Sequence, residues 1–369
     1  MIHGLEPASH TDDNVFWALL SEVKGIGPAR LRRLIDMFGD GRSAWYADAR
    51  ALVDAGLDRR ARNALIDLRK QRDPAELGNR IRAAGVELVR VIDPAYPALL
   101  KGVPDAPAVL FIKGKLPSDN EPAIAVIGTR RATAYGRQAA EKIAGELARA
   151  GVIIVSGLAR GIDAVAHNAA LAAGGRTLAV LGSGLDRIYP SEHKGLAQRV
   201  VGSGALISEF PLGEPPDAPN FPRRNRIVAG LAQGTLVIEA DRESGALITV
   251  DFALEQGRDV YAVPGSIFSP VSRGTNTLIK EGAKPVMSAE DILEDLEINA
   301  AETAVAPPAA DTDEEAVVLA LLSTEPMHID DIGRLTRLPM SILGGTLAMM
   351  ELKGTARQMG GQYYVRTGM

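Results

Sequence analysis

The stretch AIAVIGTRRATAYG (residues 123–136) decides the fold, because an apolar run ends at Gly128, two arginines follow, and a helical pattern begins near 133. Five later apolar runs follow at 152–157, 177–182, 205–209, 235–240 and 259–265. Helical patterns lie between them at 133–149, 162–173, 191–201, 222–232 and 245–257. Apolar strands that alternate with helices indicate right-handed crossovers and a doubly wound, mostly parallel sheet covered on both faces.

The rest of the chain divides into blocks around this sheet. Two further runs, at 86–92 and 108–114, predict additional strands, so we expect an α/β fold with an extended Rossmann-like domain over 75–297. An all-helical domain of helix-hairpin-helix or SAM-like type is expected at 12–74. There VKGIGPARLRRLIDMFG (23–39) has a Gly-Ile-Gly turn that can present backbone N–H groups to a phosphate, with packing alone as the alternative.

The C-terminal part reads as a linker followed by a small domain. Residues 298–313 are acidic and rich in proline and alanine, which is typical of a flexible linker. The order of helices and a terminal hairpin over 314–369 predicts a winged helix. Its candidate recognition helix, PMSILGGTLAMMELKG (339–354), has almost no base-reading side chains, and this favours a protein contact.

Composition narrows the class of protein. The chain has 369 residues, a formal net charge of -5 and no cysteine, which excludes disulfides, thiolate metal sites and a cysteine nucleophile. No apolar run is long enough to span a bilayer and no signal-peptide pattern is present, so we expect a cytoplasmic protein without membrane insertion. Because the chain is acidic, any anion site must be a local cluster of cations.

Glycines and arginines follow several strands of the predicted sheet. If the six main strands, numbered in chain order, are arranged 3-2-1-4-5-6, a ligand crevice opens between the first and the fourth strand, at the carboxyl ends. Glycines allow close approach to a ligand, and arginines suit phosphate oxygens. The residues expected to bind phosphate are Gly128, Arg130, Arg131, Ser156, Gly157, Arg160, Gly161, Lys194, Arg223, Arg224, Asn225, Arg226, Ser244 and Gly245.

The ligand is expected to be a polymer of phosphates. There is no G-x-G-x-x-G after the first strand, no carboxylate after the second, and no P-loop motif, which argues against a dinucleotide and against ATP hydrolysis. Arginines spread along one edge suit single-stranded nucleic acid, which also needs stacking surfaces. Tyr189, Phe210 and Phe221 border the arginine loops, although core packing is the alternative for each.

The segment NFPRRNRIVAG (220–230) concentrates three of the arginines in the first turn of a helix. Asn220 is the expected N-cap. Arg223 and Arg226 share the polar face, whereas Arg224 leans toward the strand ends. An alternative is that some of these arginines pair with Glu209, Glu214 or Asp217 and stabilise the loop.

Two clusters of side chains raise the question of catalysis. Asp163 and His167 lie four apart on one helix, as in a metal or acid–base pair, but a structural hydrogen bond is the favoured explanation. Glu239, Asp241 and Ser244 motivate a rival hypothesis, an enzyme that acts on a nucleotide or phosphoribosyl group. We expect no catalytic residue, no metal and no cofactor.

Six motifs in order resemble the DNA-processing protein A family (DprA, also called Smf). They are AVIGTRRATAYG (125–136), SGLARGIDAVAH (156–167), LGSGLDRIYPSEH (181–193), NFPRRNRIVAGLAQGTLVIEA (220–240), SGALITVDFALEQGRDVYAVPG (244–265) and GTNTLIKEGAKPV (274–286). The resemblance implies a non-enzymatic homodimer that protects incoming single-stranded DNA and loads the recombinase RecA on it in natural transformation.

The same resemblance assigns residues and an interface. It implies that Arg130 contacts DNA and that the dimer interface lies around 274–290. Family members often have a lysine just after the Tyr-Pro of the YPSEH segment. Here Ser191 stands at that position and Lys194 follows three residues later.

Overall fold

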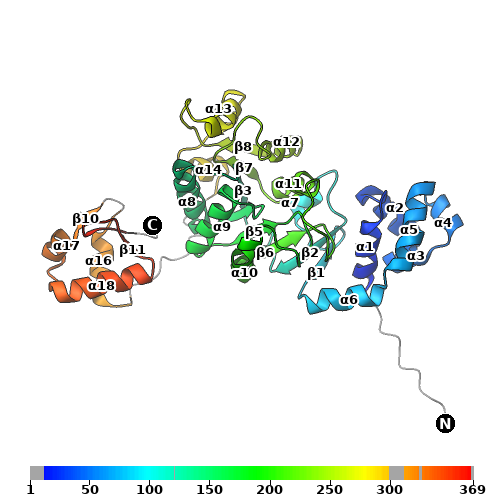
Figure 1. Cartoon of the computed structure of the whole chain (residues 1–369), viewed down its shortest axis with the longest axis horizontal. Coiled ribbons are helices and arrows are strands. Elements are labelled where there is room, and N and C mark those ends of the chain that lie inside the picture. The colour runs from blue at the N-terminus through cyan, green and yellow to red at the C-terminus, as the bar shows by residue number, and fades with distance from the viewer. Residues whose placement is uncertain (1–11, 120, 299–310, 324–325, 367–369) are drawn as a thin grey trace, which may run out of the picture. The chain divides into compact units, whose positions relative to one another are not determined.

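The computed structural model describes residues 12–119, 121–298, 311–323 and 326–366. The chain separates into two compact units, Met1–Glu302 and Thr303–Met369 (Figure 1). Most of the linker expected at 298–313 lies outside the described residues. No helix in the described ranges is long and apolar enough to cross a membrane.

Six helices begin the first unit. They are α1 (Asp13–Glu22), α2 (Pro28–Phe38), α3 (Gly41–Tyr46), α4 (Ala49–Asp54), α5 (Arg59–Gln71) and α6 (Pro74–Ala83). Aspartates at the N-caps of all but α2 accept hydrogen bonds from the free N–H groups of the first turn. Trp17 and Trp45 are fully buried among the leucines of these helices.

A nine-stranded sheet forms the centre of the first unit (Figure 1). Its strands are β1 (Glu87–Arg90), β2 (Val109–Gly114), β3 (Ala123–Ile127), β4 (Ile153–Ser156), β5 (Thr177–Val180), β6 (Ala205–Ser208), β7 (Gly234–Val237), β8 (Asp259–Ala262) and β9 (Lys284–Pro285). The two additional strands predicted at 86–92 and 108–114 are β1 and β2. They extend the sheet through antiparallel pairs, whereas β3 to β9 pair in parallel.

The strand order predicted from sequence is wrong. The observed order is β1-β2-β6-β5-β4-β3-β7-β8-β9, so the fourth main strand, β6, lies beside β5 instead of beside β3. There it also pairs with β2, with Ile207 opposite Ile112. The chain then crosses to β7, which pairs with β3 through Gly234 and Ile124. The order therefore reverses between β3 and β7, and the ligand crevice moves there.

Helices cover both faces of the sheet. They are α7 (Ala98–Lys101), α8 (Ala134–Arg149), α9 (Ile162–Ala172), α10 (Lys194–Ser203), α11 (Asn220–Gly230), α12 (Leu247–Glu255), α13 (Arg273–Lys280) and α14 (Glu290–Asp295), with short 3-10 turns η1 (Ser191–His193) and η2 (Pro270–Ser272). Side chains alternate along β3: Ile124 and Val126 pack in the core with α8 and α9, and Ala125 and Ile127 pack in the core with α10 to α12. This two-sided burial explains why the strands are apolar throughout.

The second unit is a small domain with its own core. It contains α16 (Asp313–Leu321), β10 (Met327–His328), α17 (Ile329–Thr336), α18 (Met340–Leu352), β11 (Ala356–Gln358) and β12 (Tyr363–Arg366). The three strands are arranged β10-β12-β11, and Val318, Ile332, Leu343 and Leu347 fill the core. Together with the first unit, this confirms the predicted fold class: a helical region, a Rossmann-like sheet and a winged helix.

Candidate nucleic-acid interface

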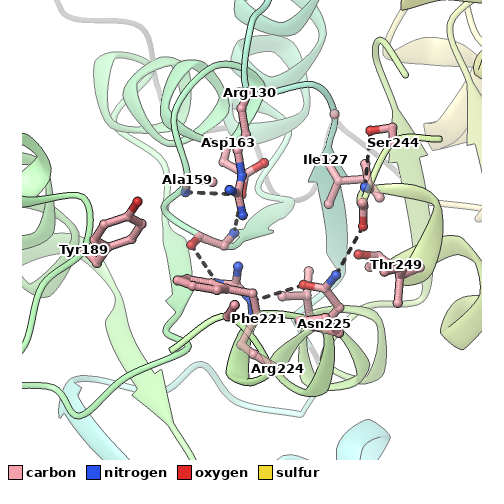
Figure 2. A pocket seen from close by; sticks show the side chains of 18 of the residues that line it. Ile127, Arg130, Ala159, Asp163, Tyr189, Phe221, Arg224, Asn225, Ser244 and Thr249 are labelled. Atoms are coloured by element: carbon pink, nitrogen blue, oxygen red, sulfur yellow. Dashed lines mark hydrogen bonds between the residues drawn. The ribbon is translucent and has the colours of Figure 1, made fainter. Parts of the chain in front are cut away.

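A groove of about 640 Å³ opens at the carboxyl edge of the sheet, where the strand order reverses (Figure 2). Its walls come from the ends of β3 and β4, the first turn of α11, and the loop that enters α12. Seven of the predicted phosphate-binding residues line it: Gly128, Arg130, Gly157, Arg224, Asn225, Ser244 and Gly245. Arg160 lines a smaller hollow that shares Arg130 and Tyr189 with the groove.

Two aromatic rings and one cation form the mouth of the groove. The Arg130 guanidinium carbon lies 5.5 Å from the centre of the Phe221 ring, and the Phe221 and Tyr189 rings lie 5.6 Å apart at 50°. Arg130 is exposed. The mouth therefore offers an exposed positive charge beside aromatic faces. Phe210, the third predicted stacking residue, is buried and does not line the groove.

A buried arginine forms the floor. The Arg224 Nη1 donates to the carbonyl oxygen of Gly157 at 2.6 Å and to that of Val180, and its Nε donates to Asn225 Oδ1 at 3.2 Å. Burial lowers the pKa of Arg224 to about 10, with Arg130 adding to the shift and Asp163 opposing it. The guanidinium is thus still charged at neutral pH, and it ties β4, β5 and α11 together beneath the groove.

Asp163 shapes the loop that faces this arginine. Its Oδ2 accepts from the backbone N–H of Gly157 at 3.1 Å and of Ala159 at 3.3 Å (Figure 2). Burial raises the pKa of Asp163, while Arg224 and the two backbone N–H groups oppose the rise. The Asp163 side chain therefore anchors the loop at 157–159, and its Oδ2 atom already accepts two hydrogen bonds from that loop.

His167 has a structural role as well. Its Nδ1 lies 2.7 Å from Thr177 Oγ1, which donates its own proton to the carbonyl oxygen of Ile154 at 2.6 Å. The hydroxyl has only one proton, so Nδ1 must be the donor in the first bond. Burial lowers the pKa of His167 to about 3. No hydrogen bond joins His167 to Asp163 among the described residues, and the structural explanation of the pair is favoured.

The arginines of α11 divide into different roles. Helix α11 begins at Asn220 itself, so the predicted N-cap is wrong by one residue: Pro219 occupies the cap, and Asn220 Nδ2 donates to Glu214 Oε1 at 3.4 Å. Arg223 and Arg226 both donate to Glu209 Oε2, at 2.9 and 2.6 Å.

Arg226 is buried and Arg223 is not. The Arg226 side chain is 6% exposed and also lies 3.0 Å from Asp105 Oδ2, whereas the Arg223 side chain is 55% exposed. The expectation that these two share a solvent-facing surface is therefore wrong. The alternative weighed from sequence, pairing with Glu209, holds for both.

The remaining predicted cations lie around the rim or away from it. Arg160 Nε donates to Glu192 Oε1 at 2.6 Å, and both side chains are about half exposed. Arg131 and Lys194 are exposed but line neither the groove nor the smaller hollow.

Two glycines of the site face protein atoms closely. A Cβ on Gly157 would lie 2.4 Å from the Arg224 guanidinium. Gly161 has a φ of +76°, and a Cβ there would lie 2.2 Å from the carbonyl oxygen of Thr129. At these two positions glycine lets segments of the chain pack closely. Ser156 is likewise structural, because its buried Oγ donates to Val126 O at 2.6 Å.

The α12 side of the groove is polar. Ser244 and Gly245 line it, and Asn225 Nδ2 lies 3.5 Å from the carbonyl oxygen of Gly245. Nearby, both carboxylate oxygens of Glu239 accept from Thr133, at 2.5 Å from Oγ1 and 3.0 Å from the backbone N–H. Within the described ranges, no group of three His, Asp or Glu side chains is placed to hold a metal ion.

Sequence reasoning missed several residues of this region. Thr249, Ile248 and Pro216 line the groove, and Asp105, in the loop between α7 and β2, pairs with Arg226. A lone aspartate in a loop before β2 gives no pattern that points to α11. Thr249 could have been found, because it belongs to the helix that follows the β7 end.

Comparison with known proteins places the chain in a family. The family model described as DNA recombination-mediator protein A matches residues 87–297, and the DprA winged helix domain matches residues 287–362. Protein Smf of Synechocystis is 38% identical over 289 residues, which cover 77% of this chain and 73% of the relative. The DNA processing protein DprA of Bacillus subtilis is 44% identical over 216 residues, 58% of this chain and 73% of that protein.

Solved structures agree with the sequence relatives. DNA processing protein A of Streptococcus pneumoniae superposes with a TM-score of 0.67 at 35% identity, covering 77% of this chain and 98% of that one. The same protein of Helicobacter pylori, described for its single-stranded DNA binding mode, gives a TM-score of 0.52 at 28% identity over 57% of this chain and 95% of that one. The six motifs, the fold and these matches together show that the chain belongs to the DNA recombination-mediator protein A family, a family of DNA-processing proteins.

Proposed function

We propose that this chain binds single-stranded DNA in the groove at the carboxyl edge of the sheet. The observation that carries the proposal is the mouth of the groove, where exposed Arg130 lies over Phe221 and beside Tyr189. Phosphates would contact Arg130 in the groove, Arg160 in the adjoining hollow and Arg223, which is exposed on α11 but lines neither, and bases would stack on the aromatic rings. The printed description of the Helicobacter pylori relative supports the same ligand.

The electrostatics of the site favour an anion that arrives from solvent. Arg224 keeps a buried positive charge beneath the groove. Its Nη1 donates to backbone carbonyls, and Asp163 offsets part of the charge.

Arg160 pairs with the exposed Glu192, and because an exposed ion pair contributes little stability, a phosphate can replace that carboxylate. The exposed Arg223 pairs with the buried Glu209, which keeps its ion pair with Arg226 when Arg223 turns to a phosphate. We therefore assign the phosphate contacts to Arg130, Arg160 and Arg223, and supporting roles to Arg224 and Arg226.

A role without catalysis is part of the proposal, and the contacts of two acids near the groove support it. The rival hypothesis of a nucleotide or phosphoribosyl enzyme needs a carboxylate aimed at a sugar, but both oxygens of Glu239 are bonded to Thr133. Asp241 is exposed and lines neither hollow. The proposal is a binding protein that acts in the cytoplasm, protects incoming single strands and loads RecA on them, as the family resemblance implies.

A homodimer is part of the proposal. Three side chains near the expected interface at 274–290 are strongly exposed: Ile267 at 78%, Phe268 at 88% and Met287 at 75%. Met287 also borders an apolar hollow of about 250 Å³ lined by Ile143, Val263 and Val286. Exposed apolar surface of this kind is typical of a protein contact. Phe268→Asp should convert the dimer to a monomer in analytical ultracentrifugation.

The binding proposal is tested by fluorescence anisotropy with a labelled dT oligonucleotide and a duplex of equal length, each at several salt concentrations. Arg130→Ala should weaken dT binding and reduce the salt slope by about one unit. Arg131→Ala is the matched control, because Arg131 is exposed and adjacent but lies outside the groove. Equal dT affinities for the two variants would contradict the proposal, as would release of ribose phosphate from nucleotides.

RecA loading needs a separate measurement. RecA filament growth on a long single strand should start with a shorter lag when the wild-type chain is present. Arg130→Ala should lengthen the lag again, and an unchanged lag with the wild-type chain would remove this part of the proposal.

A further inference from the structure

The helical region carries a concentrated basic face away from the groove. Two segments form it, residues 24–33 around the start of α2 and residues 56–60 around the start of α5. Their exposed cations, which we call the basic face, are Lys24, Arg30, Arg33, Arg59 and Arg60. The segments contain one acid, Asp58. None of the five cations lines the groove.

Contacts between residues 24–33 and residues 56–60 hold the two segments together, so their cations lie close to one another on the surface. Arg30 Nη1 lies 2.8 Å from both Gly25 O and Asp58 Oδ2. Gly25 has a φ of +95°, and a Cβ there would lie 3.2 Å from the Ala61 Cβ. The Arg33 guanidinium packs against Gly56 in the same way. Figure 1 shows α2 and α5 in the same helical cluster.

The charge of this face is largely unneutralised. Asp58 accepts from Arg30 and from the backbone N–H of Ala61, and it makes no ion pair with Lys24, Arg59 or Arg60 among the described residues. In a chain with net charge -5, such a local excess of cations points to a polyanionic ligand.

The chemistry of the face distinguishes duplex from single-stranded DNA. The two segments contain no aromatic residue, so they offer no ring on which an unpaired base can stack. Cations without stacking surfaces suit a backbone whose bases are already paired and stacked inside a helix. We propose that the basic face binds the phosphate backbone of duplex DNA, without sequence specificity, as a second site separate from the groove.

The test uses the full chain and a triple variant, Lys24→Ala, Arg59→Ala and Arg60→Ala. Arg30 and Arg33 are kept because they pack against Gly25, Asp58 and Gly56. The matched control is Arg42→Ala, Arg50→Ala and Lys70→Ala, three exposed cations of the same helical region outside the two segments. Binding of a blunt duplex and of dT is measured over a range of salt, with thermal melts to verify folding.

The triple variant should bind duplex at least about tenfold more weakly, with a salt slope reduced by up to about three units, and should bind dT like the wild type. The control should match the wild type, and Arg130→Ala should weaken dT binding and keep duplex binding. The proposal is overturned if the wild type does not bind duplex, if the triple variant binds it normally, or if duplex and dT binding fall together. Equally tight binding of poly-glutamate would also overturn it, because the face would then accept any polyanion.

Discussion

The buried carboxylate of Glu209 lies 2.6 Å from Arg226 Nη2, and the two side chains are 4% and 6% exposed. Glu209 also holds Arg223, so one acid joins a structural arginine to a solvent-facing one. Glu209 Oε1 and Arg226 Nη1 have no hydrogen-bond partner among the described residues. The stability of this buried ion pair therefore depends on the contacts that its other atoms make. Because Arg226 is buried and Arg223 is exposed, we expect their substitution to have different effects on stability and on DNA binding.

Arg226→Ala should destabilise the protein. The change leaves Glu209 buried beside Arg223 alone, and removal of one partner of a buried ion pair typically costs about 3–5 kcal/mol. Urea unfolding measures the effect. Arg223→Ala is the comparison and should lower the free energy of unfolding by less than about 1 kcal/mol. Similar small losses in both variants would show that Arg226 is not a structural residue.

Arg223→Ala should instead affect binding. Its exposed guanidinium can leave Glu209 for a phosphate, so the variant should lower the salt slope of dT binding by about one unit. Arg242→Ala, an exposed arginine beyond β7 that does not line the groove, should leave the slope unchanged. Anisotropy titrations at four salt concentrations give the slopes, and an unaltered slope for Arg223→Ala would exclude a phosphate contact.

Phe221→Leu should weaken dT binding while keeping the residue apolar. Loss of base stacking on one ring is expected to cost about 1–3 kcal/mol, or roughly 5–150-fold in affinity. Tyr46→Leu, which changes an exposed aromatic residue of α3, serves as the control. If Phe221→Leu binds dT within twofold of the wild-type affinity, Phe221 does not stack on a base, and its role is only to hold the Arg130 side chain in place.

His167→Gln should flatten the acid dependence of stability. The folded-state pKa of His167 is about 3 because the ring is buried, and the positive charge of Arg224 adds to the shift. Between pH 3 and about 6.5 the unfolded chain binds the proton and the folded chain does not, so wild-type stability falls as the pH is lowered through 6.5. The slope from this group approaches about 1.4 kcal/mol per pH unit.

Urea unfolding at pH 4 to 8 gives the free energy of unfolding of both proteins. The difference between wild type and variant at each pH isolates the contribution of His167. The rise in the pKa of Asp163 acts in the opposite direction, and it cancels in the difference as long as that carboxyl keeps its contacts with Gly157 and Ala159. A difference that does not change with pH would mean that His167 titrates normally in the folded protein.

The elements of the fold could be predicted from the sequence, but their arrangement could not. Apolar runs and helical periodicity locate β3 to β8 and the helices between them to within a few residues. Alternation also predicts parallel crossovers, because right-handed connections leave little choice. It does not determine which edge of the sheet a new strand joins. The position of β6 depends on its pairing with β2, a contact between distant segments that no local pattern encodes.

For the site as well, the sequence predicts which residues come together but not which of them are buried. Loops after parallel strands meet at one edge, so Arg130, Gly157 and Ser244 were correctly grouped from sequence. Arg226 is buried although it lies on the polar face of α11, because helical periodicity alone assigns every polar residue to the solvent side. A buried arginine is acceptable when acids from elsewhere meet it, and Asp105 and Glu209 do so here.

The acids that pair with the exposed arginines Arg160 and Arg223 affect the kinetics of DNA binding. Glu192 lies against Arg160 and Glu209 against Arg223, so the free groove projects a weaker field into solvent than its arginines alone would. An approaching strand also meets a molecule of the same sign of charge. Long-range attraction should therefore contribute little to the encounter, and the exchange of carboxylate for phosphate occurs only at contact. Residence time, rather than speed of capture, becomes the quantity that these arginines control.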